Sequence, residues 1–306
     1  MHHSQMFIGI DIGSISAKMA IIDSSRNIVH SEYILHRGNP LGAASQLVAH
    51  ARNAGCARYS RMCVTGSGRK TAGRVLGADL VKNEITATWK AAVTMMPDVK
   101  TVIEIGGQDS KLIALESGEI TRFKLNSVCA AGTGSFIEQQ SNRLGVTLDE
   151  LSTLALRSPD AAKFTGRCTV FVETEMINLQ QMGYRVEEIA AGLIDAICEN
   201  YLHDLGPGMR IESPVLFCGG VSDIQAVRVR MEKKIAQTLI VPVINKITAA
   251  YGAALLAHEQ NALSDESDIV MKELPAELSY PVRTRRAECQ HTDCLHCGIC
   301  YEKGRQ

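Results

Sequence analysis

The strongest constraint on the fold is a short pattern that occurs twice. Residues 10–22 read IDIGSISAKMAII and residues 103–115 read IEIGGQDSKLIAL, and the two segments align without a gap. In each copy an apolar run carrying one carboxylate reaches a glycine turn, and a second apolar run follows that is too short for a helix. This pattern predicts a β-hairpin with an acidic residue near the end of its first strand. Two such hairpins predict a duplicated fold, with two similar lobes and a cleft between them.

The rest of the chain has the pattern of a mixed α/β protein. Apolar residues recur at helical spacing in several segments, and short apolar runs end in glycine turns. Ser222 or Asp223 is the expected N-cap of one helix. Strands ending in such turns are predicted at 62–68 and 215–223, and helices over 41–54, 83–95, 133–144, 186–204, 223–237 and 249–257.

This organisation predicts two lobes and a tail. Lobe I is expected to comprise residues 1–100, completed by a helix at 246–260, and lobe II residues 101–245. After about residue 262 an acidic, polar stretch is followed by a basic one. Residues 261–306 are therefore expected to form a linker and a cysteine-rich tail.

Composition narrows the class of protein. The 306 residues are 45% hydrophobic and 21% charged, which is typical of a globular protein. A net charge of −1 with 5% aromatic residues predicts no nucleic-acid partner. No apolar run approaches the ~20 residues of a membrane-spanning helix. Met1–Met6 has no apolar signal-peptide core, so we expect a soluble, cytoplasmic protein that does not bind membranes.

Both hairpin turns have the composition of phosphate-binding loops. Glycines let backbone N–H groups approach phosphate oxygens, while Ser14, Ser16 and Lys18 add hydroxyl donors and a positive charge. Asp11 and Asp109 are placed to hold Mg²⁺, directly or through water, and to orient an attacking water. Neither copy fits the P-loop or the dinucleotide-binding glycine pattern. The alternative interpretation is a pair of purely structural hairpins.

A glycine pair follows the strand predicted to begin at residue 215. Gly219 and Gly220 come directly after the apolar run VLFC. Because missing side chains leave room for a flat ring, this pair favours contact with the adenosine part of a nucleotide. By itself the pair is only a weak indication.

Ten cysteines in a chain without an export signal favour metal or redox chemistry over disulfides. Cys129 in NSVCAAGTGSF and Cys168 in GRCTVFVETE each precede a predicted helix start, where backbone N–H groups and the helix dipole stabilise a thiolate. Two thiolates are too few for a four-cysteine cluster, but a two-fold dimer would supply four around its axis. The alternative is two unrelated buried cysteines. Four further isolated cysteines are expected to be small core residues.

The tail has its own cysteine pattern, C-x4-C-x2-C-x2-C. Its C-x2-C-x2-C part is typical of ferredoxin-type ligands and favours a local [4Fe-4S] cluster. The alternatives are a zinc site, with His291 or His296 replacing one cysteine, and a tail without metal. A tail cluster would act as an entry relay for electrons. The four ligands would be Cys289, Cys294, Cys297 and Cys300.

Five motifs, in this order and spacing, resemble one known family. GIDIGSISAK, EIGGQDSK, CAAGTGSF, CTVFVETE and CGGV are similar to motifs of the activators of 2-hydroxyacyl-CoA dehydratases and of related ATP-driven benzoyl-CoA reductase subunits. The resemblance covers about residues 6–260 and leaves out the cysteine-rich tail. It implies two ribonuclease-H-like lobes of the actin, Hsp70 and sugar-kinase type, with ATP in the cleft. It also implies a homodimer with one [4Fe-4S] cluster bridging the subunits.

The resemblance implies roles for individual residues. Cys129 and Cys168 of both chains would hold the bridging cluster. Asp11, Gln108 and Asp109 would serve catalysis with Mg²⁺ and water. ATP or ADP would bind at Ser14, Ile15, Ser16, Ala17, Lys18, Gly106, Gly107, Lys111, Gly132, Gly134, Gly219 and Gly220.

The implied function is electron injection driven by ATP. ATP binding and hydrolysis would change the angle between the lobes, so that one electron passes at low potential to an iron–sulfur dehydratase or reductase. A ferredoxin or flavodoxin would supply the electron, and an exposed cluster implies anaerobic conditions. The alternatives on this fold are a small-molecule, sugar-type kinase and a non-enzymatic nucleotide-dependent scaffold. A kinase has no use for paired cysteines at helix starts, so these motifs favour the ATPase.

Overall fold

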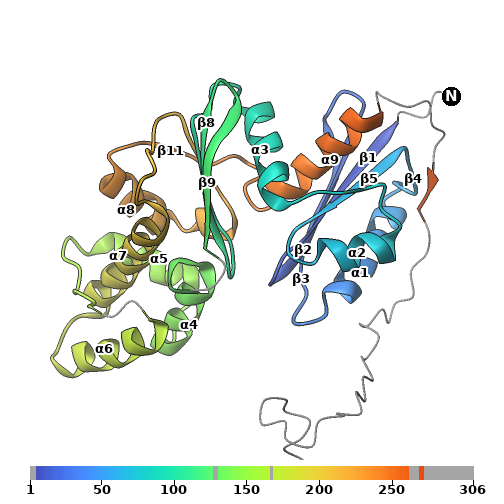
Figure 1. The fold of residues 1–306 in the computed structure, drawn as a ribbon. Helices are drawn as coiled ribbons and strands as arrows, with labels where there is room; N and C mark the ends of the chain where they lie inside the picture. The colour runs from blue at the N-terminus through green and yellow to red at the C-terminus, as the bar shows by residue number, and fades with distance from the viewer. Residues whose placement is uncertain (1–4, 127–129, 166–167, 262–268, 272–306) are drawn as a thin grey trace, which may run out of the picture.

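The computed structural model describes residues 5–126, 130–165, 168–261 and 269–271, and it shows two lobes side by side (Figure 1). Each lobe is built on a five-stranded mixed sheet. From edge to edge, the first sheet comprises β3 (Ile28–Leu35), β2 (Ser16–Asp23), β1 (Met6–Ile12), β5 (Arg61–Thr65) and β6 (Leu80–Val81). The second comprises β9 (Glu119–Asn126), β8 (Ser110–Glu116), β7 (Thr101–Ile105), β10 (Val215–Cys218) and β11 (Leu239–Ile240).

The two sheets have the same topology. In each, three consecutive strands form an antiparallel meander. A fourth strand pairs parallel with the first strand of the meander, and a fifth pairs parallel with the fourth. The repeated sequence pattern forms the β1–β2 and β7–β8 hairpins at equivalent places. The predicted α/β class and the predicted hairpins are therefore confirmed.

Lobe I consists of the first sheet with α1 (Pro40–Asn53), α2 (Arg69–Leu76) and α9 (Thr248–Asn261). Helices α1 and α2 share a core with one face of the sheet, where Ile8 and Ile10 are fully buried. The opposite face, including Phe7, packs against α9. Because both faces of β1 are covered, its sequence is a continuous apolar run rather than an alternating one.

Lobe II consists of the second sheet with α4 (Gly134–Leu144), α5 (Leu148–Arg157), α6 (Thr169–Gln181), α7 (Val186–Leu205) and α8 (Gln225–Ile235). The long helix α7 lies at the centre of this layer, with Ile194 and Tyr201 fully buried. Helix α6 lies at the periphery of the lobe (Figure 1). Among the described residues, no helix is both long and apolar enough to span a membrane.

Helix α3 (Glu84–Met95) connects the two lobes by contacting both. Ala87 and Ala91 pack in the same core as α9. Ala92 belongs to the core of the second sheet, and Trp89 packs against that core. The indole N–H of Trp89 also donates to the Gly118 carbonyl, at 2.8 Å, in the turn between β8 and β9. Helices α3 and α9 thus form one junction between lobe I and the second sheet.

The α3–α9 junction depends on a glycine. A Cβ atom added at Gly252 would lie 1.8 Å from the Ala87 carbonyl oxygen, and one added at Gly9 would lie 1.9 Å from the Ala250 carbonyl oxygen. Both obstacles are backbone atoms, so a side chain cannot be accommodated by a rotamer change. The backbones of β1, α9 and α3 therefore pack closer than any side chain would permit.

Replacing Gly252 by Ala is expected to destabilise the protein by about 1–3 kcal/mol, the usual cost of overpacking a core. Helix propensity alone predicts the opposite sign, because Ala is about 1 kcal/mol better than Gly inside a helix. The free energy of unfolding in urea measures the outcome. A more stable Gly252→Ala variant would contradict the close packing of α9 on α3.

The C-terminal part of the described chain returns to lobe I. Strand β12 (Ile269–Val270) pairs antiparallel with β4 (Arg58–Tyr59). The N–H of Met271 donates to the Ala57 carbonyl at 2.8 Å, and the Met271 side chain is buried in the core beside α1 and α2. The chain is therefore anchored on lobe I immediately before the cysteine-rich tail, which lies outside the described residues.

Most predicted elements are confirmed within a few residues, but two helices and one cap differ. Helices α2 and α5 were not predicted, since both are short and lie between glycine- or proline-containing turns. The predicted N-cap of α8 at Ser222 or Asp223 is wrong. Gly220–Asp223 forms a 3-10 turn, and Ile224 caps the helix without a side-chain hydrogen bond.

Candidate active site between the two hairpins

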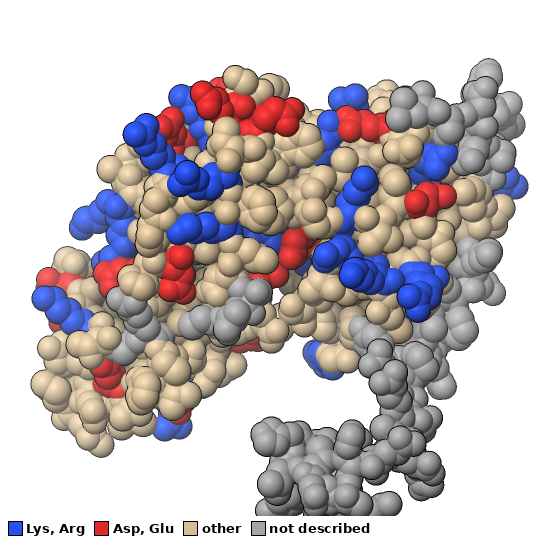
Figure 2. Space-filling view, viewed as in Figure 1, with Lys and Arg blue, Asp and Glu red and all other residues tan. Residues whose placement is uncertain are grey.

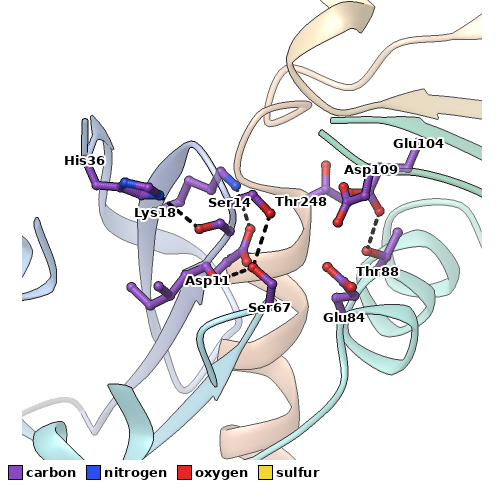
Figure 3. A network of polar contacts seen from close by, with 12 residues as sticks. Asp11, Ser14, Lys18, His36, Ser67, Glu84, Thr88, Glu104, Asp109 and Thr248 are labelled. Atoms are coloured by element: carbon purple, nitrogen blue, oxygen red, sulfur yellow. Dashed lines mark hydrogen bonds and ion pairs between the residues drawn. The ribbon is translucent and has the colours of Figure 1, made fainter. Parts of the chain in front are cut away.

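A cavity of about 830 Å³ lies between the lobes, where the two hairpin turns face each other. Figure 3 shows Asp11, Ser14 and Lys18 on one side and Glu84, Glu104 and Asp109 on the other, with Thr248 of α9 between them. The predicted residues that line the cavity are Asp11, Ser14, Ile15, Ser16, Lys18, Gly106, Gly107, Gln108, Asp109, Lys111, Gly134, Gly219 and Gly220.

Two predicted nucleotide-binding residues do not line this cavity. Ala17 is fully buried in the core of lobe I, because alternate residues of β2 point to opposite faces of the sheet. Gly132 lies in a short 3-10 helix, where an added Cβ would be 3.2 Å from the backbone nitrogen of Tyr201. Gly132 therefore permits close packing of that turn on α7 rather than lining the cleft.

In the first hairpin, the lysine is paired with the carboxylate opposite it. Asp11 and Lys18 are cross-strand partners in β1 and β2, and Lys18 Nζ lies 2.8 Å from Asp11 Oδ2. Burial alone would lower the pKa of Lys18, but the adjacent Asp11 carboxylate raises it above its ordinary value. Gly66, with φ at +91°, brings the next turn so close that a Cβ there would lie 2.4 Å from Asp11 Oδ1. Asp11 is therefore held in place between Lys18 and the Gly66 turn.

The second hairpin repeats this pair and extends it. Lys111 Nζ lies 3.0 Å from Glu104 Oε1, 3.3 Å from Asp109 Oδ1 and 3.4 Å from Glu84 Oε2. Thr88 of α3 donates to the other oxygen of Glu104 at 3.1 Å. Burial disfavours the charge on Lys111, yet the three carboxylates raise its pKa well above the ordinary value. Burial also raises the pKa of Glu84, against the attraction of Lys111.

The two turns offer backbone donors to the cavity. Gly13 N–H closes the first turn by donating to Ser16 O at 3.0 Å, and Gly106 N–H closes the second by donating to Asp109 O at 2.9 Å. At the tips of the turns, the backbone N–H groups of Ser14, Ile15, Gly107 and Gln108 have no acceptor among the described residues. Such free N–H groups in glycine turns are the donors that phosphate-binding loops present.

A third wall of the cavity is open and glycine-rich. Gly219 has φ at +88°, and an added Cβ there would lie 2.3 Å from the Ile105 carbonyl oxygen. The position of a Cβ at Gly220 meets nothing within 4 Å, so this residue leaves open space toward the cavity. Gly134 opens α4 against the second turn, its N–H donating to Gly106 O at 2.8 Å. The cleft therefore has a polar, acidic end at the hairpins and a bare backbone surface beside Gly219.

The sequence pattern of the BadF/BadG/BcrA/BcrD ATPase family matches residues 8–257, which include both hairpins and the glycine-rich wall. The chain belongs to this family of ATPases. The match ends before β12 and the cysteine-rich tail, so the tail is an addition to the family pattern. The predicted family is thereby confirmed.

Curated relatives include activators of dehydratases. The 2-hydroxyisocaproyl-CoA dehydratase activator of Clostridioides difficile is 30% identical over 256 residues, covering 83% of this chain and 95% of the relative. The activator of lactoyl-CoA dehydratase of Anaerotignum propionicum is 33% identical over 256 residues, covering 82% and 97%. The activator of the 2-hydroxyisocaproyl-CoA dehydratase from Clostridium difficile with bound ADPNP has a TM-score of 0.77 at 29% identity, covering 86% of this chain and all of that structure.

More distant structures share the fold alone. A ROK family glucokinase from Streptomyces griseus superposes with a TM-score of 0.53 at 14% identity, covering 83% of this chain and 99% of that structure. The predicted relation to sugar-kinase-type folds is confirmed by this likeness. The cysteine-rich tail, which that prediction of the architecture included, lies outside the described residues.

The structure separates the cysteines by environment. Cys168 is exposed and is the N-cap residue of α6, as predicted from CTVFVETE. The four isolated cysteines are buried, as expected, and burial raises the pKa of each of their thiols. Cys129 and the four tail cysteines lie outside the described residues. The buried thiols are Cys56, Cys63, Cys198 and Cys218.

Several polar residues in and beside the cleft were not predicted, among them Glu84, Thr88 and His36. Glu84 and Thr88 come from α3 and reach the second hairpin only because α3 packs on the second sheet. His36 follows β3 and donates from Nε2 to the Gly13 carbonyl at 3.1 Å. No local sequence signal marks these residues, whereas Glu104 could have been recognised from its alignment with Asp11.

Proposed function

We propose that this chain is an ATP-driven activator that delivers one electron to a partner iron–sulfur enzyme, either a 2-hydroxyacyl-CoA dehydratase or a related reductase. Named relatives activate such dehydratases, and a shorter stretch is 29% identical to a component of the benzoyl-CoA reductase of Thauera aromatica. The observation that carries the proposal is the exposed thiol of Cys168, at the N-terminus of α6 and outside the cavity lining. Neither a sugar-type kinase nor a scaffold needs a thiol there.

The cleft supports binding of ATP with Mg²⁺. The free N–H groups of the two turns would bind phosphate oxygens, and the bare surface at Gly219 and Gly220 would face the base. No group of three or more His, Cys, Asp or Glu side chains in the described ranges is arranged to hold a metal. Mg²⁺ commonly keeps several waters and takes one or two carboxylates together with phosphate oxygens. Asp11 and Asp109 fit that role, and Gln108 would orient the attacking water.

The surroundings of Cys168 support an iron–sulfur centre between two chains. Cys168 is exposed at the N-terminus of α6, so its sulfur is accessible for ligating a metal. Val170 and Phe171, in the first turn of α6, are 65% and 66% exposed, which suits an interface with a second copy. Together with Cys129, Cys168 of two chains would provide four thiolates. A bound [4Fe-4S] cluster would supply the capacity to accept one electron from a ferredoxin or flavodoxin and to donate it.

The contact between helices α3 and α9 supports coupling of ATP hydrolysis to electron transfer. ATP bound at both turns would contact the β1–β2 turn of lobe I and the β7–β8 turn of lobe II. Its hydrolysis would therefore change the contacts that link the two lobes. The lobes, divided near residues 100 and 245, would then change their angle by movement at the α3–α9 contact. Coupling requires that the ATP-bound and ADP-bound conformations differ in affinity for the partner.

Iron analysis tests the electron-transfer part of the proposal. The four tail cysteines are first replaced by Ser in the full-length chain, which keeps β12 and Met271 in place. The anaerobically purified dimer of this parent is expected to contain about four irons and about four acid-labile sulfides. Cys168→Ala is expected to remove both, because the substitution occurs in each chain and deprives the shared centre of half of its thiolates.

A matched control is available among the buried cysteines. Cys56→Ala removes a buried thiol of lobe I and is expected to leave iron and sulfide unchanged. A parent without iron, or a Cys168→Ala variant that retains it, would refute the bridging centre. ATP hydrolysis by the Cys168→Ala variant then shows whether the nucleotide site alone remains intact.

A further inference from the structure

The described cavity wall has four cationic side chains, of which three have carboxylate partners and one has none. Lys18 is paired with Asp11, Lys111 with three carboxylates, and Lys246 with Asp223. Arg37 also lines the cavity, and it has no hydrogen bond or ion pair with any described residue. Arg37 is thus the one lysine or arginine on the described cavity wall whose charge is not already compensated.

The backbone on both sides of Arg37 is fixed to the first hairpin. His36 N–H donates to the Ile15 carbonyl at 3.1 Å. The Gly38 N–H donates to His36 Nδ1 at 3.2 Å, so the proton of the neutral ring is on Nε2, which donates to the Gly13 carbonyl at 3.1 Å. These bonds attach the turn after β3 to the tip of the β1–β2 hairpin (Figure 3). The backbone on both sides of Arg37 is therefore attached to the Gly13–Ile15 turn.

The conformation of Arg37 itself is strained. Its φ is +44°, in the left-handed region that residues with a Cβ rarely adopt. The adjacent Gly38 has φ at +88°, so a glycine already accommodates the sharpest part of this turn. Strained backbone of this kind persists where the surrounding contacts over-determine it, and it clusters at ligand-binding sites. Here the left-handed residue is itself part of the cavity wall.

We propose that Arg37 binds the terminal phosphate of ATP from the lobe I side of the cleft. The phosphates of ATP bring several negative charges to a cavity whose lysines are already paired with carboxylates, so an unpaired cation on the wall would bind them favourably. A guanidinium presents a planar set of donors that can contact two phosphate oxygens at once. The turn of Arg37 is attached to the hairpin at the phosphate end of the cleft, whereas Gly219 and Gly220 lie in lobe II. The inference rests on the proposed nucleotide site.

The alternative occupant for Arg37 is an acidic partner protein. Tyr33, Leu35 and Arg37 also line a groove of about 630 Å³ between β3 and α1, outside the cleft. Figure 2 shows basic and acidic side chains interspersed over the face in view, without one dominant sign. An acidic partner that docked in this groove would contact Arg37 whether or not a nucleotide was bound. The following measurements distinguish the two.

The test compares nucleotides of different phosphate length on the full-length protein. Arg37→Gln is expected to weaken ATP binding by at least about 10-fold, because hydrogen bonds from a charged donor to phosphate are lost. AMP binding is expected to stay within about twofold, because AMP lacks the terminal phosphate. Arg37→Lys keeps the charge and the left-handed turn and is expected to recover part of the ATP affinity. Dissociation constants from titration calorimetry provide the comparison.

A control separates this effect from a general change of lobe I. Arg74→Gln on α2 alters another exposed arginine that is absent from the cavity wall and is expected to bind ATP, ADP and AMP as the parent does. Unchanged ATP affinity in Arg37→Gln would overturn the inference, and so would equal weakening of ATP and AMP. Intact ATP binding and hydrolysis with lost activation of a partner enzyme would assign Arg37 to docking and also overturn it. If the parent protein fails to bind ATP, the proposed nucleotide site itself fails.

Discussion

Asp109→Asn is expected to lower kcat for ATP hydrolysis at least ~100-fold, the scale usually lost when one preorganised group that stabilises transition-state charge is removed. The Asp109 side chain is 21% exposed and faces the cavity from the second turn, while its backbone oxygen accepts the Gly106 N–H at 2.9 Å. Asn has the same shape but carries no charge for Mg²⁺ or for orienting a water. Lys111 keeps Glu84 and Glu104 as partners in the variant, so the buried cation stays compensated.

Phosphate release at saturating ATP measures this prediction. Asp98→Asn, an exposed carboxylate in the loop after α3, is the matched control and is expected to keep the parental kcat. Thermal unfolding of the nucleotide-free Asp109→Asn variant is expected to resemble that of the parent. A variant with kcat within about threefold of the parent would show that Asp109 is structural, and Asp11 would then be the carboxylate to examine.

Lys111→Met is expected to destabilise the folded protein by about 3–5 kcal/mol at pH 7, the usual cost of removing one partner from a buried ionic group. Met is unbranched and flexible, so the volume is largely kept while the charge is removed. Glu84, Glu104 and Asp109 then lose the cation that lies within 3.4 Å of each of them. Because Glu84 is contributed by α3, the variant is also expected to loosen the junction between the lobes.

The pH dependence of this variant follows from the direction of the pKa shifts. In the parent, the folded pKa of Lys111 is raised, so its stabilisation is fully present below the unfolded pKa of about 10.4 and is lost only as the pH rises through the folded value. In Lys111→Met, burial without the cation keeps the folded pKa of Glu84 above its unfolded value of about 4, the direction that burial already produces in the parent. Protonation then favours the folded state. The difference in stability from the parent is therefore expected to be largest at neutral pH and smaller near pH 5.

Urea unfolding at pH 5 and pH 7 checks both the size and the sign of this effect. Lys70→Met on α2 changes an exposed lysine and is expected to alter stability by less than about 0.5 kcal/mol. Equal stability of Lys111→Met and the parent at pH 7 would contradict the ionic role. A loss that grows toward pH 5 would contradict the raised folded pKa of Glu84.

Each of the two hairpins contains the same pair of a lysine and a carboxylate. Asp11 and Lys18, like Glu104 and Lys111, are directly opposite each other across a β-hairpin, so each lysine neutralises the carboxylate of its own hairpin. The lysines were predicted to contribute positive charge at the phosphates. Their ion pairs give them a second role, which is to hold the carboxylates in position at the base of the cleft. That pairing is also why Arg37 is the cation left for the nucleotide.

Much of the site follows from local sequence, because hairpins are local structures. The repeated pattern in residues 10–22 and 103–115 defines two strands, a glycine turn and the facing acid and lysine, and all of these are confirmed. The position of Cys168 before α6 was likewise readable, since a helix start is determined by neighbouring residues. These features need only contacts between residues close in the chain.

Only the tertiary structure decided which distant groups meet at the cleft. Glu84 reaches Lys111 because α3 packs between the lobes, and the His36–Arg37 turn reaches Gly13 because β3 completes the sheet. The physical reason is the same in each case. Burial and long-range ion pairing depend on how whole faces of helices and sheets pack together, and no short segment encodes that by itself.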